Sequence, residues 1–139
     1  VVQMAYEGLS FQEGSQPDYA KMKSAFLDSA TFRSYRFEKV GLFSIEGYLN
    51  SYRKSVESGA FKAVVEKEVW GETKVFGKVA HRLSTYVTYI NDMDKIVERG
   101  VNSFQLVKTD DGWKISSCNY DTEKEGQPIP RTYLKDSDK

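Results

Sequence analysis

The stretch that decides the fold is Val79-Ala80-His81-Arg82-Leu83-Ser84-Thr85-Tyr86-Val87-Thr88-Tyr89-Ile90, in which apolar and polar residues alternate. Side chains that alternate point to opposite faces of a sheet, so this stretch predicts a half-buried strand. Residues 63–75 and 101–115 alternate in the same way on either side of it. Asp110-Asp111-Gly112 is typical of a tight turn before a fourth strand, from Trp113 to about Tyr120. The second half of the chain therefore predicts a curved antiparallel sheet with one packed face.

The first half of the chain predicts three helices and one short strand. The first two helices show helical spacing of apolar residues, at Val2, Ala5, Tyr6 and Leu9 and then at Tyr19, Met22 and Phe26. Residues 15–18 resemble a capping box at the start of the second helix. An alternating strand over 31–37 precedes a third helix, which has Ser44 as its N-cap and Gly59 at its end. Helices grouped on one side of an antiparallel sheet define an α+β fold.

The composition limits the classes of protein that this chain can belong to. Its 139 residues predict one domain over 1–139, with a frayed polar tail over about 131–139. Twenty basic and twenty acidic residues cancel, so we expect no nucleic-acid partner, and no apolar run is long enough to span a bilayer. A single cysteine excludes an internal disulfide and favours a reducing compartment, which we expect to be the cytoplasm. The chain begins at Val1 rather than at a methionine, which leaves a preceding segment open.

A set of short motifs runs through nearly the whole chain. They are Asp18-Tyr19, Glu66-Lys67-Glu68-Val69, Phe76-Gly77 with Ala80-His81, Gly100-Val101-Asn102-Ser103-Phe104, Gly112-Trp113-Lys114-Ile115, Tyr120-Asp121 and Pro128-Ile129-Pro130. This set resembles the nuclear transport factor 2-like superfamily, which has the cystatin-like cone fold, and within it the SnoaL-like and lumazine-binding-like bacterial domains. The resemblance implies a cone-shaped, strongly curved antiparallel sheet, with three helices of the N-terminal half covering the concave face and closing a pocket. It also implies a homodimer joined through the sheets, but no particular activity, because the same fold serves many functions.

His81 is the first candidate for chemistry, because an imidazole titrates near physiological pH and can move a proton in either direction. Strand alternation puts it on one face with Leu83, Thr85 and Val87, and we interpret this face as the one that lines the pocket. The alternative is a structural histidine bonded to a neighbouring hydroxyl or carboxylate.

Glu66 and Glu68 are the second candidates, because they share a strand face. Two neighbouring carboxylates raise each other's pKa and can divide the roles of acid and base. If either faces inward, we expect it to pair with His81 across adjacent strands. The alternative is a stripe of charge that faces solvent or a dimer partner.

Asp18, Tyr19 and Tyr35 are candidates through the resemblance. In the dehydratase and isomerase branches the corresponding helices contribute Tyr and Asp to the pocket, and Tyr35 lies where the scytalone dehydratase-like branch has a carbonyl-polarising tyrosine. The alternatives are a helix cap for Asp18 and core packing for Tyr19. This chain has one histidine where that branch has two, and the matching strand carries Asn102, which can orient a ligand but cannot act as a base.

Three functions therefore compete. The first is a small-molecule-binding domain with a mostly apolar, aromatic-lined pocket, whose ligand contacts would come from Tyr6, Tyr19, Tyr35, Leu83, Thr85, Asn102 and Phe104. The second is a cofactor-free lyase or isomerase, of the dehydratase, ketosteroid isomerase or polyketide cyclase type, that uses His81 with Glu66, Glu68 or Asp18. The third is a dimeric assembly module. We expect no cofactor and no metal, and as partners a small apolar or aromatic molecule and a second copy of the chain.

Overall fold

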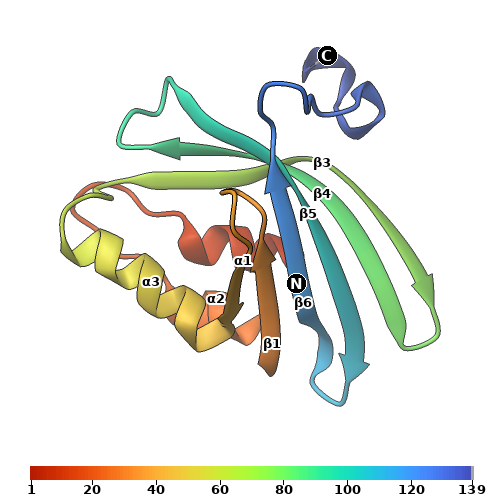
Figure 1. Ribbon diagram of the computed structural model, residues 1–139. Helices are drawn as coiled ribbons and strands as arrows, with labels where there is room; N and C mark the ends of the chain where they lie inside the picture. Colours follow the sequence, from red (N-terminus) through yellow and green to blue (C-terminus); the bar gives the residue numbers. More distant parts are fainter. Residues whose placement is uncertain (139) are drawn as a thin grey trace.

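The computed structural model describes residues 1–138, which form three helices and one six-stranded sheet (Figure 1). The elements in chain order are α1 (Val2–Leu9), α2 (Tyr19–Ser24), β1 (Phe26–Ser34), β2 (Gly41–Ser44), α3 (Ile45–Glu57), β3 (Val64–Phe76), β4 (Val79–Ile90), β5 (Ile96–Thr109) and β6 (Gly112–Thr122). Two single-turn helices, Arg131–Tyr133 and Asp136–Asp138, follow the last strand. The α+β class and the four long strands are confirmed.

The strand order in the sheet is β2-β1-β6-β5-β4-β3. The long strands β3 to β6 form the predicted antiparallel meander, but β1 runs parallel to β6, so the sheet is mixed rather than wholly antiparallel. β1 also begins earlier than predicted, at Phe26 rather than Thr31. The amide of Ile115 donates to the carbonyl of Ala25, which stops α2 at Ser24 and carries Phe26 into the strand instead of the helix.

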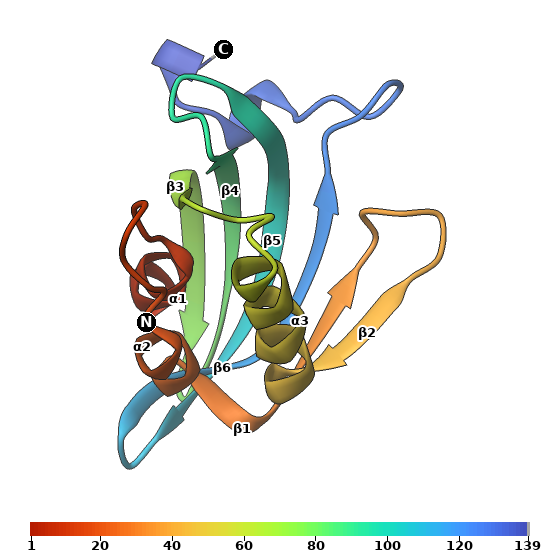
Figure 2. The ribbon, with the colours of Figure 1, turned by 90° about the vertical axis from the view of Figure 1, so that its left-hand side faces the viewer.

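α3 begins at the predicted cap Ser44, whereas α2 is capped by Asp18, the alternative role for that residue, and not by Ser15 of the predicted capping box. Asp18 accepts a hydrogen bond from the amide of Lys21, and Ser44 accepts one from the amide of Gly47. All three helices pack against the concave face of the sheet, which arches over them (Figures 1 and 2). Their apolar faces supply much of the core, which includes Tyr6, Met22, Leu49, Phe104 and Ile115. No helix in the described part of the chain is both long and apolar enough to cross a membrane.

The two faces of β4 are the reverse of the prediction. Ser84 and Tyr86 point toward the helices, since Ser84 bonds the hydroxyl of Tyr6 in α1 and Tyr86 belongs to the core. Alternation then places His81, Leu83 and Thr85 on the outer, convex face. The prediction that the face with His81 lines the pocket is wrong. Ser84, Tyr86 and Thr88 occupy the concave side instead, because their hydroxyl groups find partners there.

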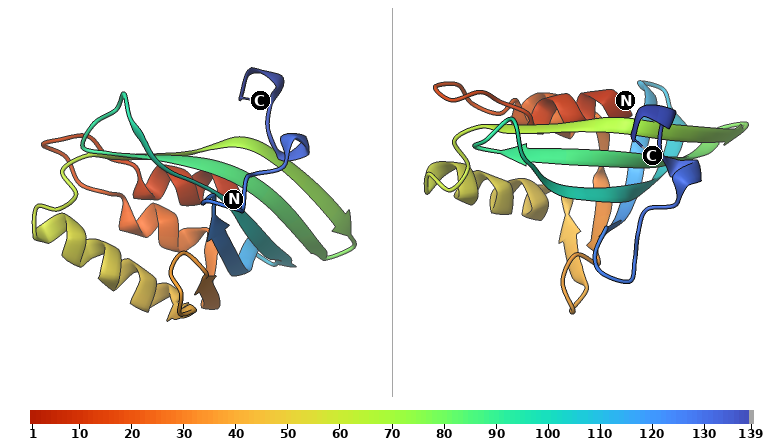
Figure 3. Two further views of the ribbon diagram at one scale, coloured as in Figure 1. Left: turned by 45° about the horizontal axis from the view of Figure 1, so that its top comes forward. Right: turned by 90° about the horizontal axis from the view of Figure 1, so that it is seen from above.

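The C-terminal segment lies across the convex face of the sheet (Figure 3). The Tyr133 ring stacks on Trp70 at a centroid distance of 5.1 Å, and the Thr85 hydroxyl donates to the Tyr133 carbonyl at 2.7 Å. Ile129 and Leu134 are buried. The prediction of a frayed tail does not hold for Tyr133 and Leu134, since these contacts anchor them. The homodimer through the sheet stays a prediction, and such a dimer would meet this segment.

We expect Gly8→Ala to destabilise the fold at the contact between α1 and α2. A Cβ added at Gly8 would lie 2.6 Å from both Cβ and N of Met22, so backbone atoms would have to move. Overpacking of this kind costs about 1–3 kcal/mol, measurable as the free energy of unfolding in urea. Gly47→Ala is the matched control, because the nearest atom to its new methyl would be Ser44 Oγ at 3.2 Å. Equal losses in the two variants would contradict the close α1–α2 packing.

Candidate active or ligand-binding site

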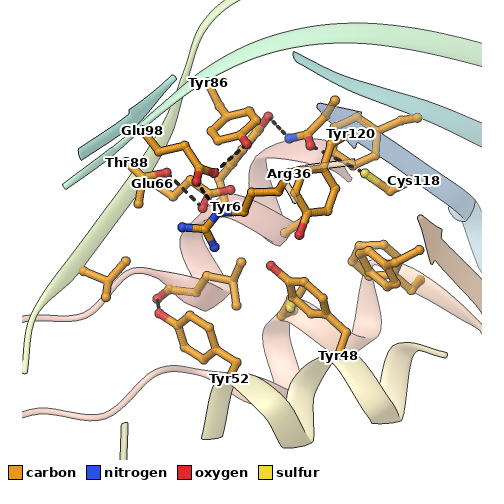
Figure 4. Close-up of a pocket in the computed structure, with 18 of the residues that line it drawn as sticks. Tyr6, Arg36, Tyr48, Tyr52, Glu66, Tyr86, Thr88, Glu98, Cys118 and Tyr120 are labelled. Atoms are coloured by element: carbon orange, nitrogen blue, oxygen red, sulfur yellow. Dashed lines mark hydrogen bonds and ion pairs between the residues drawn. The ribbon is translucent and has the colours of Figure 1, made fainter. Parts of the chain in front are cut away.

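A cavity of about 110 Å³ lies between the concave face of the sheet and the helices. Figure 4 shows that its polar groups come mainly from the sheet and its tyrosines from both sides. The lining is mostly aromatic and aliphatic and includes Tyr6, Phe26, Phe32, Arg36, Tyr48, Tyr52, Phe61, Val64, Glu66, Tyr86, Thr88, Glu98, Asn102, Phe104, Cys118 and Tyr120. Its size is of the same order as the roughly 150 Å³ engineered cavity that accepts benzene.

Glu66 is the carboxyl group inside this cavity. Among the described residues its side chain has one hydrogen bond, from the Thr88 hydroxyl at 3.3 Å, and no ion pair. Burial away from water, with a smaller contribution from the negative charge of Glu98, raises the pKa of Glu66 to about 7. At neutral pH this group is therefore divided between its protonated and ionised forms, so it can both donate and accept a hydrogen bond or a proton.

A second carboxyl, that of Glu98, lies at the edge of the cavity and is paired. It accepts a hydrogen bond from the Tyr86 hydroxyl at 2.8 Å and forms an ion pair with Nε of Arg36 at 2.5 Å. The Arg36 side chain is 44% exposed, whereas that of Glu98 is 16% exposed, so the pair extends from the cavity toward solvent. In Figure 4 the guanidinium lies beside the carboxyl groups of both Glu66 and Glu98.

Tyr6 takes part in a chain of hydrogen bonds on the inner side of the sheet. Ser84 donates its single proton to Glu68 at 2.6 Å, so the 2.6 Å bond between Tyr6 and Ser84 must be donated by Tyr6. The amide group of Asn102 donates to the Tyr6 oxygen at 2.8 Å, and the Cys118 thiol in turn faces the Asn102 carbonyl at 3.6 Å. The Tyr6 proton is therefore directed away from the cavity, and burial raises its pKa.

The hydroxyl groups of Tyr48 and Tyr120 point toward each other across the cavity in Figure 4. Burial raises the pKa of both, that of Tyr48 most strongly, so both stay protonated at neutral pH. Tyr52 differs, because its hydroxyl donates to the Leu9 carbonyl at 2.5 Å. Tyr48 has no hydrogen-bond partner among the described residues, which leaves it free to donate to a ligand.

The structure brings only one of the predicted chemical residues into the cavity. Glu66 lines it, whereas Glu68 shares the same face but forms a two-bond ion pair with Arg82 at 2.5 and 2.9 Å. Asp18 caps α2 on the surface. His81 is exposed on the other side of the sheet, opposite Lys74 and Gln105, so the predicted pairing of Glu66 or Glu68 with His81 is not formed.

The predicted ligand contacts divide in a similar way. Tyr6, Asn102 and Phe104 line the cavity. Tyr19 packs against Tyr52 beneath the guanidinium of Arg53, and Tyr35 is 48% exposed outside the cavity. Leu83 and Thr85 do not line the cavity. Like His81, they lie on the convex face, because strand alternation puts them opposite Ser84 and Tyr86.

Sequence reasoning missed several cavity residues, among them Arg36, Tyr48, Tyr52, Tyr86, Thr88, Glu98, Cys118 and Tyr120. Strand alternation could have predicted Glu98, because it lies on the same face of β5 as Asn102 and Phe104. Arg36 lies in the turn between β1 and β2, where no periodicity applies. In the described chain, no three side chains of the metal-binding kinds come together as a metal site would need.

Several solved structures resemble this chain in fold, at sequence identities too low to imply a shared function. A protein of unknown function with a cystatin-like fold from Nostoc punctiforme is 8% identical, with a TM-score of 0.68, over 88% of this chain and 85% of that one. A Streptomyces avermitilis protein proposed to be a dehydratase of the NTF2-like family is 17% identical, with a TM-score of 0.64, over 87% and 89%. The yeast UBP3-associated protein BRE5 is 12% identical, with a TM-score of 0.64, over 88% and 91%.

These likenesses establish the NTF2-like, cystatin-like fold that the sequence motifs predicted. No protein-family model matches the chain. No curated protein sequence matches it either.

We expect the burial of Glu66 to make the protein less stable as pH rises. Its pKa is about 7 in the folded state against 4.5 as the ordinary value, so the folded state binds the extra proton between these values. Stability therefore falls from about pH 4.5 to pH 7, by on the order of 3 kcal/mol if the whole shift is realised. Glu66→Gln removes this titration. Its free energy of unfolding relative to wild type should rise between pH 5 and pH 8.

The control for this comparison is Glu57→Gln, which removes one negative charge from the exposed end of α3. A difference between Glu66→Gln and wild type that is constant across this pH range would contradict the burial of an uncompensated carboxyl.

Proposed function

We propose that this protein binds a small, largely apolar molecule in the cavity, with Glu66 as the polar group that orients it. The observation that carries the proposal is the desolvated carboxyl of the half-buried Glu66, which has a single 3.3 Å hydrogen bond in a mostly aromatic and aliphatic cavity. A buried polar group with too few partners lowers stability, so its presence is best explained by a partner that arrives with a ligand.

The surrounding hydroxyl groups define what that ligand would offer. Tyr48 is free to donate, whereas Tyr6 and Tyr52 have already donated their protons to Ser84 and to the Leu9 carbonyl. Glu66 can donate or accept, because its pKa is about 7. A hydroxyl or carbonyl oxygen on an apolar body would satisfy Glu66 and Tyr48 together. The ligand class is therefore a small alcohol, phenol or ketone with a ring or a short aliphatic skeleton.

Benzyl alcohol and toluene test this proposal as a matched pair. We expect wild type to bind benzyl alcohol about five- to tenfold more tightly, because one hydrogen bond contributes about 1 kcal/mol. Glu66→Leu should abolish or reverse that preference. Chemical-shift titration gives both affinities, and the melting temperature should rise with each ligand that binds. If neither probe shifts resonances of Tyr48, Glu66 or Phe104, the cavity does not bind such molecules and the proposal fails.

A second candidate function, that of a cofactor-free isomerase or lyase, is favoured by the raised pKa of Glu66. A carboxyl that titrates near pH 7 can remove a proton from a carbon beside a carbonyl and return it to a neighbouring carbon. The Tyr48 hydroxyl, which stays protonated, could donate to the carbonyl oxygen as negative charge develops there. This version replaces His81 with Glu66 as the base, since His81 lies on the other side of the sheet.

Proton exchange into a small cyclic ketone in D₂O, followed by NMR, tests the enzyme candidate. We expect exchange to increase with pH to a plateau with a midpoint near 7, as Glu66 ionises. Glu66→Gln should slow it by at least about 100-fold, whereas His81→Gln should leave it unchanged. Equal rates in Glu66→Gln and wild type would remove the enzyme candidate while leaving the binding proposal intact.

A further inference from the structure

A second hollow adjoins the cavity, between α3 and the β1–β2 hairpin. This outer groove has a volume of about 230 Å³. It shares five lining residues with the cavity, namely Arg36, Tyr48, Tyr52, Phe61 and Tyr120. The same side chains therefore border both hollows, so the cavity and the groove lie next to each other.

The lining of the outer groove is cationic and aromatic. Arg36 and Lys39 are its charged residues, no carboxyl group lines it, and Phe37 and Phe43 add two aromatic rings. Ser34, Ser51 and Ser55 contribute hydroxyl groups. In the described part of the chain Lys39 has no ion-pair partner. A groove with two cations and no acid is complementary to an anion.

Arg36 occupies the boundary between the two hollows. Its Nε atom forms an ion pair with Glu98 at 2.5 Å, and a guanidinium has five N–H donors, so donors remain for another acceptor. Because Glu98 already neutralises Arg36, the uncompensated positive charge in the groove is that of Lys39 alone. One negative charge would balance it, and a carboxylate could accept from Lys39 and Arg36 together.

We propose that the ligand also carries a carboxylate: its ring, with the hydroxyl or carbonyl oxygen that Glu66 orients, enters the cavity, and its carboxylate binds Lys39 and Arg36 in the outer groove. This inference rests on the proposed function, that the cavity binds a ligand. It adds a requirement for one negative charge and a short spacer between ring and charge. The aromatic side chains along the shared wall would pack against that spacer.

A matched pair of probes, 3-phenylpropanoate and 3-phenylpropan-1-ol, separates this inference from the proposed function. We expect isothermal titration calorimetry at pH 7 and low salt to show the acid binding about tenfold more tightly than the alcohol. Lys39→Gln should remove most of that preference without changing the affinity for the alcohol. Lys54→Gln, an exposed lysine of α3 that lines neither hollow, is the control and should change neither affinity.

The possible outcomes are distinct. If acid and alcohol bind equally and Lys39→Gln has no effect, the anionic subsite is wrong while the binding function stands. If Lys39→Gln and Lys54→Gln weaken binding of the acid equally, the preference comes from the overall positive charge of the surface, and the inference is overturned. If 2-phenylethylphosphonate binds more tightly than the acid, the assignment to a carboxylate is wrong. If none of these probes binds, the inference fails, whereas benzyl alcohol and toluene decide the proposed function separately.

Discussion

The hydrogen bond from Tyr6 to Ser84 is the interaction on which the rest of the structure depends. It joins α1 to β4 within the core, at 2.6 Å, and both residues are almost wholly buried. It also fixes which face of β4 is concave, because Ser84 can reach Tyr6 only from the helix side. Glu68 and Asn102 satisfy the remaining bonding capacity of the pair. This bond therefore determines which face of the sheet is concave. The cavity lies where the helices do not fill the space under that face.

The chemistry of the cavity follows from how charges on this face are distributed. Arg82 is committed to Glu68 and Arg36 to Glu98, so each arginine compensates a carboxyl other than Glu66. Glu66 is left with the Thr88 hydroxyl, and burial then raises its pKa. The charge of Arg36 lowers the pKa of Glu66 by less than burial raises it, because Arg36 is paired with Glu98. The same commitment of Arg36 to Glu98 leaves Lys39 as the free positive charge of the outer groove.

Much of the fold could be predicted from the sequence, because it depends on local periodicity and capping. Ser44 marks the start of α3 correctly, the motif over 15–18 locates α2 although Asp18 rather than Ser15 caps it, and the alternation of Val79 to Ile90 predicts a strand. Periodicity cannot say which set of alternating residues faces inward when both sets mix apolar and hydroxyl side chains, and this error displaced His81, Leu83 and Thr85. Alternation from Glu66 and Glu68 would put Trp70 on the concave face, but Trp70 stacks on Tyr133 on the convex face. A register shift between Glu68 and Trp70 reverses strand parity there. The position of Arg36 could not be predicted, because it depends on how the turn between β1 and β2 folds back over the cavity.

The measurement that tests the central claim most directly is an NMR titration of the side-chain carboxyl carbon of Glu66 in the free protein. We expect a midpoint near pH 7, because the carboxyl is desolvated and the nearby Arg36 is paired with Glu98 instead. Saturating benzyl alcohol should shift that midpoint, since the ligand would bond the same oxygen atoms. A midpoint near the ordinary value of a glutamate, about 4.3, unaffected by the ligand, would show that Glu66 is solvated. The cavity would then contain no uncompensated group for a ligand to satisfy.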